Sequence, residues 1–139
     1  MSDAGRSLIA HAAFRESSDK FDHLVLAIIV AVIGFLVQTI PFGKLGLNVE
    51  TMYLYALTLF GLAGISAFKR TEWSIQVYAK NHSMLESIEK RNQAGFLGNR
   101  IALEKCQSRT CFYYRARNIF IFTGLVCFII TKVFENYVR

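Results

Sequence analysis

The chain has 139 residues, of which 53% are hydrophobic and 19% charged, and its formal net charge is +6. Charged residues are absent from three apolar runs, residues 24–43, 51–68 and 118–131. A soluble core would interleave charged and apolar residues at the period of a helix or a strand. The composition therefore excludes a soluble globular domain and predicts an all-α membrane protein with three transmembrane helices.

The first 22 residues form a polar segment, and residues 3–16 have the apolar spacing of a short amphipathic helix. Two alternatives stay open for it: a frayed terminus, or an interfacial helix that lies on the cytoplasmic leaflet. Ser17, Ser18 and Asp19 are residue types that cap helix N-termini. We therefore expect a second helix to begin there and to continue into the first apolar run.

The first two apolar runs predict a transmembrane hairpin over residues 23–68. A helix rises about 1.5 Å per residue and needs about 20 apolar residues to cross a bilayer. We expect spans at about 24–41 and 51–68. Pro41, followed by two nearby glycines, predicts the end of the first span and a short outer turn.

Residues 69–117 carry ten basic and four acidic side chains and contain no proline. Apolar residues recur here at helical spacing, so the second helix is expected to leave the bilayer and project about 35 Å, or about 24 residues at 1.5 Å each. These residues are the candidate cytoplasmic interface: Trp73, Val77, Tyr78, Met84, Leu85 and Ile88.

Gly95 and Gly98 predict the end of this long helix, and Asn99 is a candidate cap for the next one. Residues 69–94 and 99–117 should then pack as a coiled-coil-like helical hairpin. The next helix is expected to continue into a third span within residues 118–139. That run has only 14 uncharged residues, so it spans if Arg117 and Lys132 extend their charged ends to the two interfaces.

The distribution of charge predicts the orientation of the protein. Loops near span ends carry their excess of Lys and Arg on the cytoplasmic side. We therefore expect residues 69–117 and the N-terminus in the cytoplasm, and the C-terminus outside a bacterial inner membrane. Three cysteines are an odd number, and they lie in the basic stretch or in the third run, which favours reduced thiols.

Candidate sites in the apolar runs are few. No ionisable side chain lies inside them, which disfavours a coupled transporter or pump. Small residues at four-residue spacing favour close helix packing, either within one chain or between copies. The candidate packing or pore residues are Ala27, Ala31, Gly34, Gln38, Gly61, Ala63, Gly64, Ala67 and Gly124.

The chain has no phosphate-binding loop, no serine-hydrolase motif and no paired acid cluster in its sequence. We expect no catalytic residues, no cofactor and no metal site, and hence no enzyme. The excess positive charge of 69–117 fits the positive-inside rule and anionic lipid headgroups, and its alternative is an acidic partner. The expected partners are the bilayer, further copies of the chain and a cytoplasmic protein, without nucleic acid.

Four segments carry a family resemblance: S-D-K-F-D-H-L-V-L-A (18–27), V-Q-T-I-P (37–41), F-K-R-T-E-W-S-I-Q (68–76) and N-H-S-M-L (81–85). The chain resembles a group of small bacterial membrane proteins with K-F-D before the first span and F-K-R-x-E after the second. Their activity is not established, so the resemblance implies no reaction.

A looser likeness, of architecture alone, is to membrane effectors of bacterial anti-phage defence. It implies a self-associating protein that perturbs the membrane or forms a pore. The alternative function is a membrane anchor or scaffold that recruits a cytoplasmic partner through residues 69–117.

Overall fold

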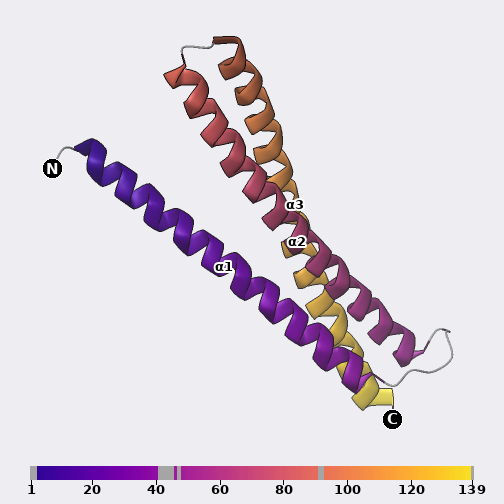
Figure 1. The fold of residues 1–139 in the computed structure, drawn as a ribbon. Coiled ribbons are helices and arrows are strands. Elements are labelled where there is room, and N and C mark those ends of the chain that lie inside the picture. The colour runs from indigo at the N-terminus through magenta and orange to yellow at the C-terminus, as the bar shows by residue number, and fades with distance from the viewer. Residues whose placement is uncertain (1–2, 41–45, 47, 91–92, 139) are drawn as a thin grey trace.

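The computed structural model describes residues 3–40, 46, 48–90 and 93–138, with side chains from residue 16 onward. It contains three helices in these ranges, α1 (Asp3–Thr39), α2 (Val49–Glu89) and α3 (Gln93–Val138), and no strand (Figure 1). All three are long and apolar enough to cross a membrane. The prediction of an all-α chain with three such helices is confirmed. The predicted stop at Pro41 lies outside the described residues.

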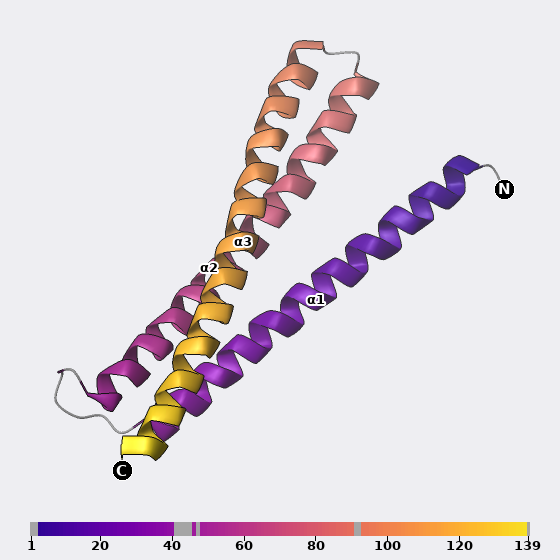
Figure 2. The same ribbon diagram turned by 180° about the vertical axis from the view of Figure 1, so that it is seen from behind.

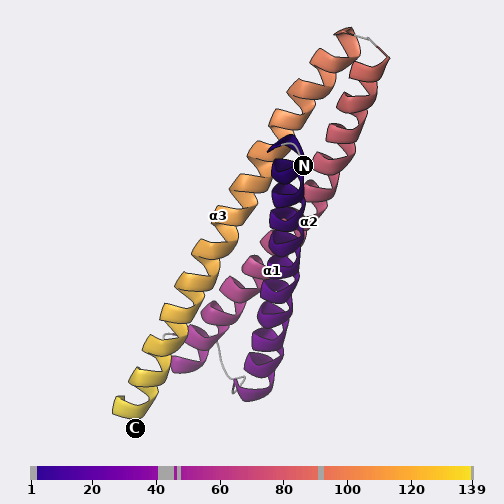
Figure 3. The same cartoon turned by 90° about the vertical axis from the view of Figure 1, so that its left-hand side faces the viewer.

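α2 and α3 pack side by side as a long antiparallel hairpin, and α1 packs against α2. α1 approaches the hairpin at its C-terminal end and leans away from it toward its N-terminal end (Figures 1 and 2). Figure 3 views the molecule from the side of α1, which crosses in front of the hairpin. Most of the packing in the molecule is therefore between α2 and α3, and α1 contacts this hairpin over only part of α1's own length.

The N-terminus of α2 is capped by an asparagine, a residue type that favours this position. Asn48 has an extended backbone conformation, and its side-chain oxygen accepts a hydrogen bond of 3.2 Å from the backbone N–H of Thr51. Glu50 places an acidic group in the first turn, where the helix dipole favours negative charge. Without an internal proline, α2 then continues for 41 residues.

The turn between α2 and α3 differs from its predicted position. α2 ends at Glu89 and α3 begins at Gln93, so Gly95 and Gly98 lie inside α3. A glycine inside a helix costs only about 1 kcal/mol, which packing against a partner helix offsets. Asn99 is not a cap: its side-chain amide donates to the Ser83 carbonyl at 3.3 Å and joins α3 to α2.

α1 is one continuous helix, so the predicted helix start at Ser17–Asp19 and a separate helix over 3–16 are both wrong. Residues 6–33 contain neither glycine nor proline, and nothing in the local sequence around Ser17–Asp19 forces an interruption. Asp19 instead accepts a hydrogen bond of 3.3 Å from the Tyr78 hydroxyl of α2. The side chains that decide amphipathicity in residues 3–15 lie outside the described part of the chain.

The buried side chains form two apolar clusters where α1 meets α2. In the first cluster, Leu36 of α1 and Ile40, which follows α1, contact Tyr53 and Phe60 of α2. In the second, Ile29 of α1 packs on two small residues of α2, Ala63 and Ala67. Small side chains let the two backbones approach closely, which explains why α1 crosses α2 there.

Candidate functional site

Three charged residues, one from each helix, meet near the middle of the molecule. A single carboxylate oxygen of Asp22 (α1) accepts hydrogen bonds from Nη1 of Arg70 (α2) and, at 2.9 Å, from Nη1 of Arg117 (α3). The Asp22, Arg70 and Arg117 side chains are only 13%, 14% and 2% exposed. We call Asp22, Arg70 and Arg117 the ion cluster.

The cluster lies where the apolar runs end, because each of its residues is within two positions of such a run. Asp22 precedes residues 24–43, Arg70 follows residues 51–68, and Arg117 precedes residues 118–131. The expectation that Arg117 extends its charged end outward is wrong: its side chain turns inward to Asp22 and is almost fully buried. Pairing with a carboxylate satisfies the guanidinium better than a purely apolar helix surface would.

The aromatic ring of Tyr114 supports both arginines. The guanidinium carbon of Arg70 lies 4.6 Å from the ring centroid, and that of Arg117 lies 5.1 Å from it. The negative face of an aromatic ring attracts such cations, most strongly where water is excluded. Tyr114 therefore helps to hold two like charges close together.

The ion cluster keeps an excess of positive charge. Two guanidinium groups share one carboxylate, so its formal charge is +1. Nε of Arg70 is buried and has no hydrogen-bond partner in the described part of the chain. Buried polar groups without a partner are uncommon and costly. The Arg70 side chain also lines a pocket beside the cluster, which makes its guanidinium a candidate contact for an anion.

Further polar pairs lie beyond the cluster along the hairpin. The guanidinium carbon of Arg109 (α3) lies 4.8 Å from the ring centroid of Trp73 (α2). Lys69 donates a 2.7 Å hydrogen bond to Glu72, and this bond raises the pKa of the Lys69 ammonium. Both side chains of the Lys69–Glu72 pair are 45% exposed, far more than those of the ion cluster.

A polar pocket of about 390 Å³ opens next to the ion cluster, between α1 and the hairpin. Hydroxyl groups from all three helices line it, together with Arg70. The lining residues are Ser18, Arg70, Ser74, Val77, Tyr78, Gln107, Thr110, Cys111 and Tyr114.

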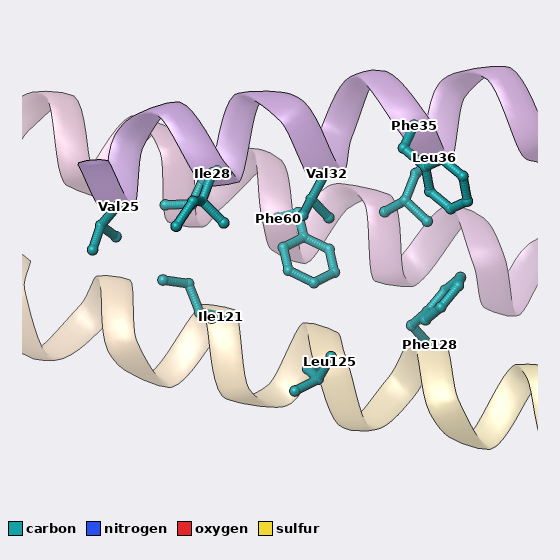
Figure 4. A pocket seen from close by; sticks show the side chains of 10 residues that line it. Val25, Ile28, Val32, Phe35, Leu36, Phe60, Ile121, Leu125 and Phe128 are labelled. Carbon is teal, nitrogen blue, oxygen red and sulfur yellow. The ribbon is translucent and has the colours of Figure 1, made fainter. Parts of the chain in front are cut away.

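An apolar pocket of about 460 Å³ lies on the other side of the ion cluster, between α1 and α3 (Figure 4). Side chains of α1 and α3 face each other across it, and Phe60 of α2 lies between them. The lining residues are Val25, Ile28, Ile29, Val32, Phe35, Leu36, Phe60, Ile121, Leu125 and Phe128. We call this pocket the apolar groove.

The structure brings four of the predicted packing residues into contacts within the chain. Ala63 and Ala67 are buried under α1. A methyl group built on Gly64 would lie 3.5 Å from Ile29 Cγ2, and one built on Gly124 would lie 3.3 Å from the Phe60 ring. Packing inside one chain accounts for these positions.

The other predicted packing residues face away from the rest of the chain. Ala27, Ala31, Gly34 and Gln38 are exposed on the side of α1 opposite to its buried residues. We call these four residues the outer face of α1. A methyl group built on Gly34 or on Gly61 would meet no atom within 4 Å, so both positions are open.

The six predicted interface residues of the hairpin separate into two groups. Trp73, Val77, Tyr78 and Met84 are half-buried, whereas Leu85 and Ile88 are exposed. An interface for a partner stays a prediction, and Leu85 and Ile88 are its most accessible members.

The sequence reasoning missed Asp22 and Arg70 as site residues. A signal for them exists in hindsight, because Asp22 is the acidic residue of K-F-D and Arg70 is the arginine of F-K-R. The two motifs that carry the family resemblance therefore meet in one ion pair. Comparisons of the chain with protein-family models, curated proteins and solved structures give no match.

Proposed function

We propose that the chain is a non-enzymatic integral protein of the bacterial inner membrane. Its spans are residues 24–41, 51–68 and the third apolar run, with residues 69–117 and the N-terminus in the cytoplasm and the C-terminus outside. This orientation is supported by the ten basic residues of 69–117. The large apolar side chains on the surface of the spans then contact lipid instead of water.

The protein self-associates through the outer face of α1. The observation that carries this proposal is that Ala27, Ala31 and Gly34 form a stripe of small residues that the chain's own packing leaves uncovered. Such stripes let helices approach closely in a bilayer, where lipid supplies no hydrophobic drive for association. Gln38 is exposed on the same face, where its amide can hydrogen-bond to a neighbouring copy.

In the assembled state the protein perturbs the membrane or forms a pore, as an effector of anti-phage defence would. The basic hairpin receives the trigger, because α2 and α3 run continuously from their apolar parts into residues 69–117. A change at the hairpin can therefore reach the spans through rigid helices.

The test of self-association is a leucine at Gly34. Gly34→Leu adds a large side chain to the outer face of α1, where the protomer has open space. We expect the wild-type protein in lipid nanodiscs or mild detergent to be an oligomer and Gly34→Leu to shift it to smaller species, measured by native mass spectrometry. Gly61→Leu is the matched control, because Gly61 has equally open space but lies on α2.

Dye release from liposomes tests the pore. The wild-type oligomer should release an entrapped dye, and Gly34→Leu should release less than Gly61→Leu. A wild-type protein that is monomeric, or two leucine variants with the same mass distribution, contradicts self-association through α1. An oligomer that neither releases dye nor reduces growth on overexpression contradicts the membrane-perturbing role.

A second candidate function, a scaffold for a cytoplasmic protein, is favoured by one observation. Large apolar residues are more than half exposed on the part of the hairpin that the proposed topology places in water. They are Ile75, Leu85, Ile88, Leu97, Ile101 and Phe112. Exposed apolar residues outside the lipid mark protein interaction sites when they gather in patches.

Paired aspartates separate this candidate from the first one. Leu85→Asp with Ile88→Asp should abolish co-purification of a cytoplasmic protein with the full chain while leaving the oligomeric mass unchanged. The exposed polar pair Lys80→Asp with Glu89→Asp on the same helix is the control. A partner that remains bound to the Leu85/Ile88 variant contradicts the scaffold.

A further inference from the structure

We propose that the gap between α1 and α3 binds an anionic phospholipid of the cytoplasmic leaflet. The lipid phosphate contacts Arg70, which lines the polar pocket, and one acyl chain lies in the apolar groove. The proposal rests on the membrane placement given under the proposed function, and it does not depend on self-association.

The order of residues along the helices matches the order of chemical groups in a phospholipid. Along α1, Ser18 of the polar pocket is followed one turn later by Asp22 and then by Val25 of the apolar groove. Along α3, Tyr114 of the polar pocket is followed by Arg117. The polar headgroup therefore lies at the polar pocket, the phosphate at the ion cluster and the acyl chain in the apolar groove.

The apolar groove has the length of one leaflet. It extends along α1 from Val25 to Leu36, which is eleven steps, or about 16 Å. Half of a hydrocarbon core of about 30 Å is about 15 Å. Ile28, Phe35 and Leu125 line the groove and are also exposed, so a chain can enter from the surrounding lipid (Figure 4).

The ion cluster supplies charge complementarity at the correct end of this groove. Its formal charge is +1, and Nε of Arg70 is buried without a partner. Asp19, one turn from Asp22, makes no ion pair with either arginine in the described part of the chain and accepts from Tyr78 instead. Arg70 lines the polar pocket, so its guanidinium can pair with a phosphate there, and guanidinium groups bind phosphate strongly.

A second copy of the chain fits the site less well than a lipid does. A span from another copy could fill the apolar groove, but none of the three apolar runs contains an acidic residue. It would therefore cover the excess charge with apolar side chains, which is unfavourable. An anionic lipid satisfies both the groove and the charge.

Native mass spectrometry of the full-length protein tests the proposal. The protein is transferred into mixed micelles that contain equal amounts of dioleoylphosphatidylglycerol and dioleoylphosphatidylcholine, and retained lipids are identified by mass. We expect phosphatidylglycerol to be retained in preference to phosphatidylcholine. Inorganic phosphate, added as the competitor, should not displace it, because it brings no acyl chain.

Two pairs of variants locate the site. Arg70→Gln should weaken phosphatidylglycerol retention about tenfold, the effect of losing a charged hydrogen bond. Lys69→Gln removes the same charge at a more exposed neighbour and should leave retention unchanged. Ile28→Trp fills the apolar groove and should reduce the retention of both lipids, whereas Val30→Trp, exposed but outside the groove, should not.

Equal retention of the two lipids, or equal effects of Arg70→Gln and Lys69→Gln, overturns the proposal. Displacement by inorganic phosphate at low concentration overturns it in favour of a free-anion site. Loss of the oligomer in Ile28→Trp with lipid retention unchanged overturns it in favour of a second copy in the groove. The same spectra report oligomeric mass, so a monomer that still prefers phosphatidylglycerol contradicts self-association alone.

Discussion

At the scale of single residues, the ion cluster decides how α1 is held to the hairpin. Asp22 is the only residue through which α1 makes an ion pair with α2 or α3 among the described residues. Two arginines depend on its carboxylate, and neither is well exposed to water. Asp22 therefore contributes more to holding α1 against the hairpin than its position in a polar N-terminal segment indicates.

Asp22→Asn should destabilise the protein by about 3 kcal/mol, because removing one partner leaves poorly solvated charges uncompensated. The free energy of unfolding, measured by titration from mild micelles into sodium dodecyl sulfate, checks this value. Glu16→Gln is the control: its carboxylate pairs with Lys20 at 2.7 Å on the exposed surface of the same helix. An exposed pair contributes less than about 1 kcal/mol.

Equal free energies for Asp22→Asn and Glu16→Gln would contradict a structural role for the ion cluster. The lipid proposal would then also lose its basis, because the arginines would not be held in place. A loss confined to Asp22→Asn supports the cluster as the fastening point of α1.

At the scale of elements, small residues decide which helix faces meet. Gly124 of α3 lies against the Phe60 ring of α2, and Gly64 of α2 lies under Ile29 of α1. The spacing of small residues predicted which helix faces could pack closely. It did not predict which of these faces would be buried within the chain. The spacing of Ala27 and Ala31 on α1 is the same as that of Ala63 and Ala67 on α2, yet only the second pair is buried.

Gly124→Leu should lower the free energy of unfolding by about 1–3 kcal/mol, because even a single added carbon would lie 3.3 Å from the Phe60 ring. Gly61→Leu should cost little or add stability, since that position is open and leucine favours helix formation more than glycine does. The same titration of unfolding checks both. Similar values for the two variants would show that α3 can shift away from α2 without loss.

At the scale of the whole molecule, the three helices share an apolar end, and all three continue well beyond it. α2 and α3 are 41 and 46 residues long, about twice what a span needs. The hydrogen bond from Asn99 to the Ser83 carbonyl ties the far end of the hairpin together. A rigid arm of this kind suits either a trigger or a partner.

Thiol labelling checks the proposed topology. Cys111 is exposed on α3 within residues 69–117, so a membrane-impermeant maleimide should label it in inverted vesicles and not in intact spheroplasts. Asn136→Cys in a Cys111→Ser background should show the opposite pattern, because Asn136 is exposed beyond the third apolar run. Labelling of both positions from the same side would contradict three membrane crossings.

Hydropathy along the chain predicted the number, order and apolar segments of the helices, because burying charge in a lipid-facing helix is costly wherever the helix lies. The positions at which the helices begin and end were predicted less well. Gly95 and Gly98 looked like a break and lie inside α3, and Ser17–Asp19 looked like a cap and lies inside α1. Packing against α2 offsets the cost of the two glycines in α3, and no helix breaker stands near Ser17–Asp19 in α1.

The sequence by itself determined that this is an all-α chain with three helices able to cross a membrane. Along the chain, Arg70 lies 48 residues after Asp22, and Arg117 lies 47 residues after Arg70. Only the tertiary structure decided that Arg70 and Arg117 both pair with the carboxylate of Asp22. It also decided that α1 buries Ile29 and leaves Ala27 and Ala31 uncovered. The physical reason is that apolar character acts locally, whereas an ion pair and a packed face depend on how the helices cross.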